Sequence, residues 1–120
     1  MKSVLIGYGY WGKIIKRYIE GNNYFELVGV CDPALENSLN LEDILKSKDI
    51  ECAFVCSPVD THYSTVKKLL EHNKHVFCEK PLCKDFNETK ELVNLSEKKE
   101  VCLYTCLLYT SDAADDLLCV

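Results

Sequence analysis

The sequence predicts an α/β fold built on a doubly wound parallel sheet. Short apolar runs alternate with segments in which apolar residues recur every three or four positions, the pattern of strands alternating with helices. The run at residues 52–56 is continuously apolar, as expected of a strand covered on both faces. A glycine-rich turn at residues 7–12 joins the first apolar run to the first helical segment. These observations indicate parallel strands joined by right-handed crossovers.

The first half of the chain is expected to hold three strands and two helices. The strands are predicted at residues 2–6, 25–31 and 52–56. A helix is predicted at residues 11–20 by the spacing of Trp11, Ile14, Ile15, Tyr18 and Ile19. Asn40 is a good N-cap for a short helix at residues 41–46.

The second half is expected to hold two further helices and two further strands. Asp60 or Thr61 would cap a helix that runs to residue 71 and buries Tyr63, Val66, Leu69 and Leu70. Asp85, followed by Glu88, resembles a capping box for a helix that extends to residue 98. The strands are predicted at residues 75–78 and 101–105.

The composition is that of an ordinary globular domain. Of 120 residues, 48% are hydrophobic and 28% charged, and the net charge of −5 comes with no basic cluster, so nucleic acid is not an expected partner. We find no membrane span and no signal peptide, and therefore expect a cytoplasmic protein. The eight cysteines form no C-x-x-C pair and most fall in apolar runs, so we expect packed free thiols and no metal site.

The glycine-rich turn has the spacing of a dinucleotide-binding fingerprint. In that pattern Gly7 allows the tight turn, Gly9 lets a diphosphate approach the backbone, and Gly12 lets the helix pack close to the strand. The N-terminus of the helix presents unpaired N–H groups to the diphosphate. Asp32, twenty positions past Gly12, completes the pattern as an acceptor for ribose hydroxyls. The alternative is a plain glycine turn with a surface aspartate.

Asp32 also bears on the choice of cofactor. A 2′-phosphate on the ribose would meet its carboxylate. No Arg or Lys follows within Pro33-Ala34-Leu35-Glu36 to accommodate that phosphate. We therefore expect NAD as the cofactor, with NADP less favoured.

Three further segments accompany the glycine turn, namely Cys31-Asp32-Pro33, Ser57-Pro58-Val59-Asp60-Thr61-His62 and Lys74-His75-Val76-Phe77-Cys78-Glu79-Lys80-Pro81-Leu82. In this combination, residues 1–105 resemble the nucleotide-binding half of the Gfo/Idh/MocA oxidoreductases. The resemblance implies a Rossmann-like domain of a homo-oligomeric enzyme that transfers a hydride between nicotinamide and a small sugar, nucleotide sugar or cyclitol. A non-catalytic NAD-binding sensor or regulatory module is the alternative.

The resemblance also implies a role for each matching position. The diphosphate would be lined by Gly7, Gly9, Tyr10, Trp11 and Gly12. The adenosine and the ribose side of the diphosphate would be bordered by Ser57, Pro58, Thr61 and His62. Glu79 would hold the nicotinamide ribose, Lys80 would act on the substrate as the catalytic cation, and Pro81 would fix the loop. Outside this context, a strand-end lysine is more often solvated, and a lone histidine more often caps or packs.

The end of the chain departs from the family pattern. Family members continue into a second domain that binds substrate and carries a catalytic histidine, whereas no histidine follows Thr105 here. Residues 106–120 resemble instead the conceptual translation of a sequencing-library adapter. We therefore expect a dinucleotide-binding domain at residues 1–105 and a non-native or disordered tail at residues 106–120, in a fragment that is inactive by itself. A genuine short helix with an acidic cap is the alternative.

Overall fold

Five parallel strands and one antiparallel strand form a single sheet in the computed structural model, which describes residues 1–106 and 117–119. The strands are β1 (Lys2–Ile6), β2 (Glu26–Cys31), β3 (Cys52–Val55), β4 (His75–Glu79), β5 (Leu103–Cys106) and β6 (Leu117–Cys119). The helices are α1 (Tyr10–Glu20), α2 (Leu41–Lys46), α3 (His62–Glu71) and α4 (Phe86–Lys99), with the 3₁₀ turn η1 (Val59–Thr61) before α3. The sequence predicts all of these helices and strands except β6.

The strand order β2-β1-β3-β4-β5-β6 confirms the doubly wound sheet. Strands β1 to β5 pair in parallel, and β6 pairs with β5 in the antiparallel sense. The chain passes from β1 outward to β2 and then crosses back to β3, so the strand order reverses beside β1. Ile6 lies opposite Cys31 on one side and Val55 on the other, so these three strands end level with one another. Ligands of open α/β sheets bind at such a switch point, beyond the carboxyl ends of the strands.

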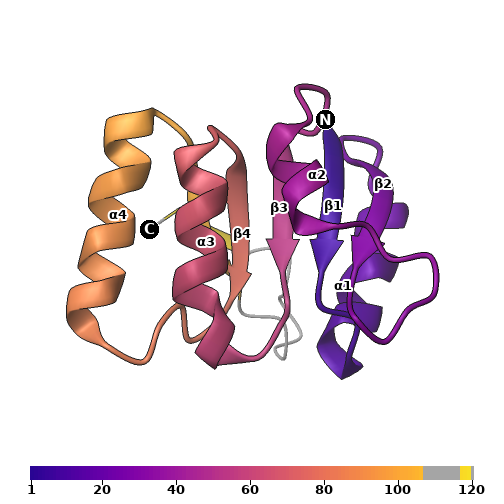
Figure 1. The fold of residues 1–120 in the computed structure, drawn as a ribbon, viewed down its shortest axis with the longest axis horizontal. Coiled ribbons are helices and arrows are strands. Elements are labelled where there is room, and N and C mark those ends of the chain that lie inside the picture. Colours follow the sequence, from indigo (N-terminus) through magenta and orange to yellow (C-terminus); the bar gives the residue numbers. More distant parts are fainter. Residues whose placement is uncertain (107–116, 120) are drawn as a thin grey trace.

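Helices cover both faces of the sheet (Figure 1). α2, α3 and α4 lie on the near face in this view, and α1 lies behind β1 and β2. Because successive strand residues point to opposite faces, Val4 and Leu5 of β1 belong to different cores. The core of the near face includes Val4, Ile44, Val55, Val66, Leu69, Val76, Leu92 and Leu103. The core beneath α1 includes Leu5, Ile15, Ile19, Cys52 and Phe54.

Two of the predicted helix caps are confirmed, and one is wrong. Asn40 Oδ1 accepts a hydrogen bond from the Glu42 N–H at 2.8 Å, and Asp85 Oδ1 accepts one from the Asn87 N–H at 2.7 Å. Thr61 does not cap α3, because its hydroxyl lies 2.8 Å from Ser57 Oγ and 2.7 Å from Pro58 O instead. Thr61 still occupies the N-cap position, and α3 starts at His62, directly after it.

The described cysteines pack as small side chains. Cys31, Cys52, Cys83 and Cys102 carry free thiols, and Cys52 and Cys78 are fully buried. Burial raises the pKa of Cys52 to about 11, so this thiol is neutral at physiological pH. Among the described residues, no helix is long and apolar enough to cross a membrane.

Candidate dinucleotide site

Four loops that leave the carboxyl ends of β1 to β4 carry the residues predicted for the site. Gly7 follows β1, Asp32 follows β2, Ser57 lies beyond the end of β3, and Lys80 follows β4. Hydrogen bonds link the loop after β1 to the loop after β2, and the His62 ring contacts the loops after β3 and β4. The fold therefore gathers the predicted residues at one edge of the sheet, on both sides of the switch point.

Gly7 and Gly12 are required by close approach of the backbone. Gly7 has a φ of +96°, and a Cβ there would stand 2.5 Å from the Ser57 backbone nitrogen. A Cβ on Gly12 would stand 2.2 Å from the carbonyl oxygen of Gly7. The Gly7 N–H donates to the carbonyl of Cys31 at 2.9 Å, which ties the turn to the end of β2. These contacts hold α1 tightly against β1 and the loop after β3.

Gly9 differs, because a Cβ built there meets no atom within 4 Å. Its φ of −84° and ψ of −154° are open to any residue, so the position is not explained by backbone conformation. Gly9 is also the N-cap of α1, and no side chain caps that helix. Open space beside an N-terminus without a side-chain cap suits a diphosphate, which accepts hydrogen bonds from main-chain N–H groups. Tyr10 and Trp11, whose rings meet edge to face at 5.2 Å, open the helix beside this space.

Asp32 ties the glycine turn to the loop after β2. Its Oδ2 accepts a hydrogen bond from the Tyr8 N–H at 2.6 Å, and its Oδ1 accepts one from the Ala34 N–H at 2.8 Å. The N–H donors of Ala34 and Tyr8 hold the pKa of Asp32 below its usual value. Each carboxylate oxygen keeps acceptor capacity for a hydroxyl of a ligand. Sequence reasoning missed the bond to Tyr8, because a main-chain donor leaves no trace in residue identity.

Ser38 is a second residue that sequence reasoning missed. Its Oγ accepts a hydrogen bond from the Asp32 N–H at 2.8 Å and donates to the carbonyl of Leu39 at 2.9 Å. Ser38 therefore fixes the backbone of Asp32 from the far end of the loop. Only the serine's preference for turns could have suggested this role.

The segment after β3 is bonded within itself. The Thr61 hydroxyl joins Ser57 and Pro58, as described above, and Pro58 and Thr61 are exposed. His62 is the buried member, only 2% exposed. Its Nε2 lies 2.8 Å from Ser57 O, and its Nδ1 lies 2.9 Å from Pro81 O and 3.1 Å from Leu82 O. The ring thus lies between the loops after β3 and β4, with both nitrogens occupied by main-chain carbonyls.

The Oε2 atom of Glu79 is buried and has no hydrogen-bond partner. Among the described residues, it is the one buried side-chain oxygen or nitrogen in that situation. Burial raises the pKa of Glu79, whereas the backbone N–H of Lys80 and the nearby charges of His62 and Lys80 act in the opposite direction. A buried acceptor without a donor is unfavourable, and a ligand hydroxyl would supply the missing hydrogen bond. Lys80 and Pro81, which follow at the exposed rim, are joined by a cis peptide bond.

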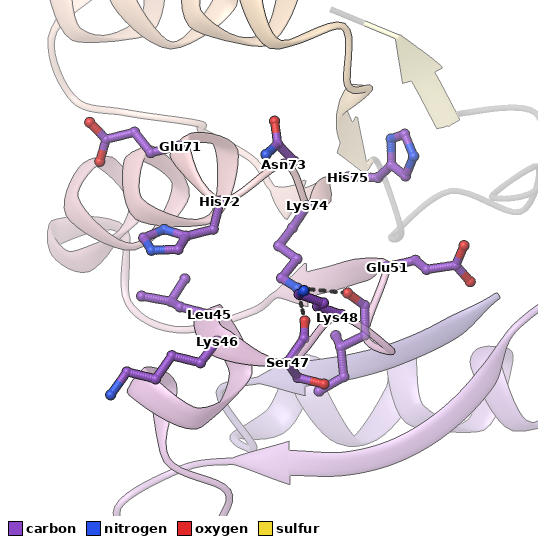
Figure 2. Close-up of a pocket in the computed structure, with 11 residues that line it drawn as sticks. Leu45, Lys46, Ser47, Lys48, Glu51, Glu71, His72, Asn73, Lys74 and His75 are labelled. Atoms are coloured by element: carbon purple, nitrogen blue, oxygen red, sulfur yellow. Dashed lines mark hydrogen bonds between the residues drawn. The ribbon is translucent and has the colours of Figure 1, made fainter.

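A hollow of about 600 Å³ lies at the opposite edge of the sheet (Figure 2) and contains none of the residues predicted for the site. It lies between the C-terminal ends of α2 and α3. Lys74, only 4% exposed, donates from Nζ to the carbonyls of Ser47 and Ile50 there. Burial lowers the pKa of Lys74. The lysine satisfies carbonyls at the end of α2, so its main-chain contacts give it a structural role.

The fold, together with the residues gathered at the carboxyl edge of the sheet, defines an α/β nucleotide-binding domain. A family model described as "Oxidoreductase family, NAD-binding Rossmann fold" matches residues 1–106, and the chain belongs to this family, the Gfo/Idh/MocA oxidoreductases.

Relatives support the same assignment. An uncharacterised oxidoreductase of Streptococcus pneumoniae is 29% identical over 111 residues, which cover 84% of this chain and 30% of that protein. An inositol 2-dehydrogenase of Rhizobium meliloti is 30% identical over 89 residues, covering 65% of this chain and 27% of that enzyme. The crystal structure of an oxidoreductase from Bacillus cereus shares the fold with a TM-score of 0.82 at 24% identity, covering 88% of this chain and 34% of that one. The chain thus spans about a third of the length of the relatives it matches.

Proposed function

We propose that the domain binds NAD(H) in preference to NADP(H) along the carboxyl edge of β1 to β4. The observation that carries this proposal is the pairing of Asp32 with the glycine turn, through the 2.6 Å hydrogen bond from the Tyr8 N–H. This bond puts a carboxylate beside the loop that leaves open space at Gly9. A 2′-phosphate in that position would be repelled by the carboxylate. The orphaned Oε2 of Glu79 adds a second acceptor for a sugar hydroxyl.

In this proposal each part of the edge has one task. The N-terminus of α1, with Gly7, Gly9, Tyr10, Trp11 and Gly12, would hold the diphosphate. Asp32 would accept hydrogen bonds from the adenosine ribose, and Glu79 from the nicotinamide ribose. Ser57, Pro58, Thr61 and Pro81 would border the cofactor. NAD, when bound, supplies the hydride-accepting ring, and Lys80 would orient or polarise a substrate hydroxyl beside it.

The protein to which the domain belongs would then act on a sugar, nucleotide sugar or cyclitol. The support is family membership, together with a relative named as an inositol 2-dehydrogenase. We further propose a cytoplasmic homo-oligomer as the full enzyme, and no turnover by this chain alone. We also propose that residues 106–120 are not part of the native domain, although Cys106 ends β5.

Titration calorimetry with NAD⁺ and NADP⁺ tests the cofactor proposal. We expect wild type to bind NAD⁺ at least about tenfold more tightly, a difference of about 1.4 kcal/mol. Asp32→Ala should weaken the binding of NAD⁺ more than the binding of NADP⁺, and so reduce the preference for NAD⁺. Equal affinity of the wild-type domain for the two dinucleotides would refute the role given to Asp32.

A further inference from the structure

The His62 ring is placed where two loops of the proposed site meet. Its Nε2 lies 2.8 Å from the carbonyl of Ser57, in the loop after β3. Its Nδ1 lies within 3.1 Å of the carbonyls of Pro81 and Leu82, in the loop after β4. The ring is 2% exposed, so it cannot present an edge to a ligand at the surface.

The three neighbouring oxygens can only accept hydrogen bonds. A ring nitrogen that faces a carbonyl must therefore carry a hydrogen if the contact is to be favourable. A neutral imidazole has one N–H, so it could bond to one loop and would turn a lone pair toward the other. Hydrogens on both nitrogens satisfy both loops at once.

The two joined loops carry different parts of the proposed site. One holds Ser57 and Pro58 and leads to Thr61 in η1, and the other begins with Lys80, directly after Glu79 at the end of β4. The glycine turn and Asp32 are joined by contacts that do not involve His62, through Tyr8 and Cys31, although Gly7 also packs against the Ser57 backbone. A change at His62 should therefore disturb the loop after β4 more than the glycine turn.

We propose that His62, hydrogen-bonded through both ring nitrogens, is a positioning residue that joins the loops after β3 and β4 and thereby sets the nicotinamide half of the site without touching the cofactor. This inference rests on the proposed function. It assigns the histidine to the second half of the dinucleotide and gives it a fixed hydrogen-bonding state. A histidine that only stabilised the core would affect both halves of the ligand equally.

The test compares two ligands on one variant. His62→Gln can donate from only one end of its amide, so it keeps one of the two links at best. We expect NAD⁺ affinity to fall about tenfold or more, and ADP affinity to change less than about threefold, because ADP lacks the nicotinamide ribose. His72→Gln, at an exposed histidine that ends α3, is the matched control and should bind both ligands like wild type.

The outcomes separate the two proposals. If wild type binds ADP and NAD⁺ and His62→Gln loses affinity for both equally, the role of His62 is overturned and the proposed function stands. Wild type that binds neither ligand would overturn the proposed function and the His62 inference with it. If the variant does not fold, long-range ¹H–¹⁵N NMR of the wild-type histidine rings still decides. Hydrogens on both His62 nitrogens support the inference, and a single ring N–H overturns it.

Discussion

At the scale of single residues, the glycine turn combines two different requirements. Gly7 and Gly12 are needed by the fold, because a Cβ at either would overlap main-chain atoms. Gly9 is not needed by the fold, because a Cβ there meets only open space. The motif predicts separate roles for the three glycines, and the contacts likewise separate two tightly packed glycines from one that faces open space. This difference can be tested one glycine at a time.

Gly9→Asp is expected to preserve or raise stability while abolishing NAD⁺ binding. Aspartate is a favoured N-cap, and its carboxylate would accept hydrogen bonds from the first N–H groups of α1. The same carboxylate would repel a diphosphate. We expect a melting temperature equal to or above that of wild type, and no NAD⁺ binding by calorimetry. If the variant binds NAD⁺ like wild type, the diphosphate does not bind beside Gly9.

Gly12→Ala, in contrast, should lower the stability of the fold. Alanine favours a helix over glycine by about 1 kcal/mol. The 2.2 Å contact with the Gly7 carbonyl forces the backbone to move, and such overpacking costs about 1–3 kcal/mol. Because the contact is with rigid main chain, we expect the steric cost to win. The melting temperature should fall by several degrees, and an unchanged value would contradict the close packing of α1 on β1.

Asp32 should contribute an acid-sensitive part of the stability. Main-chain donors lower its pKa in the folded state, so ionised Asp32 favours folding. This contribution is complete above the ordinary aspartate pKa of about 3.9 and is lost as pH falls through the lower folded-state value. The melting temperature of Asp32→Asn should lie below that of wild type at neutral pH, and the difference should disappear in acid.

An exposed aspartate in the loop before β3 provides the control for that experiment. Asp49→Asn should melt like wild type at every pH. A gap between Asp32→Asn and wild type that stays constant down to about pH 3 would show that ionisation of Asp32 does not support the fold.

At the scale of elements, local signals predict best. Asn40 and Asp85 cap the helices that follow them because a cap depends on a residue and its next few neighbours. The start of α3 at His62 fits Thr61 as its N-cap, but the Thr61 hydroxyl bonds to Ser57 and Pro58 and makes no capping hydrogen bond. The antiparallel pairing of β6 with β5 depends on a contact between distant segments, which no local pattern encodes.

Asn40→Ala is expected to lower the free energy of unfolding by about 1 kcal/mol, the usual cost of losing an N-cap. The Glu42 N–H would lose its side-chain acceptor at the start of a helix of only six residues. Urea denaturation followed by circular dichroism measures the change. Asn37→Ala, in the exposed loop before Ser38, is the matched control. Equal stabilities of the two variants would show that the cap contributes nothing.

At the scale of the whole molecule, alternating strands and helices were enough to predict the parallel sheet, and the candidate residues gather at the carboxyl edge of its strands. They could not show how the loops at that edge are joined. The contacts of Asp32 with Tyr8 and of His62 with Ser57, Pro81 and Leu82 involve main-chain atoms. The orphaned oxygen of Glu79 depends on burial by its surroundings. Such contacts can be identified only once the folded structure is known.

A chain that stops after Cys106, the residue that ends β5, tests the proposal for residues 107–120 of the tail. The matched family region ends at that residue, and β5 is complete there. We expect its melting temperature to lie within about 2 °C of the full chain, as for changes away from special features. A shortened chain that unfolds would make residues 107–120 a structural element of the domain, through β6 or otherwise.

The most direct test of the central claim is a backbone NMR titration of the wild-type chain with NAD⁺. We expect chemical-shift changes at the amides of the glycine turn, at Asp32 and around Glu79, all at the carboxyl edge of the sheet. The amides around Lys74, at the opposite edge, should stay unchanged. Shifts concentrated around Lys74, or no shifts at any NAD⁺ concentration, would contradict the claim that this edge is a dinucleotide site.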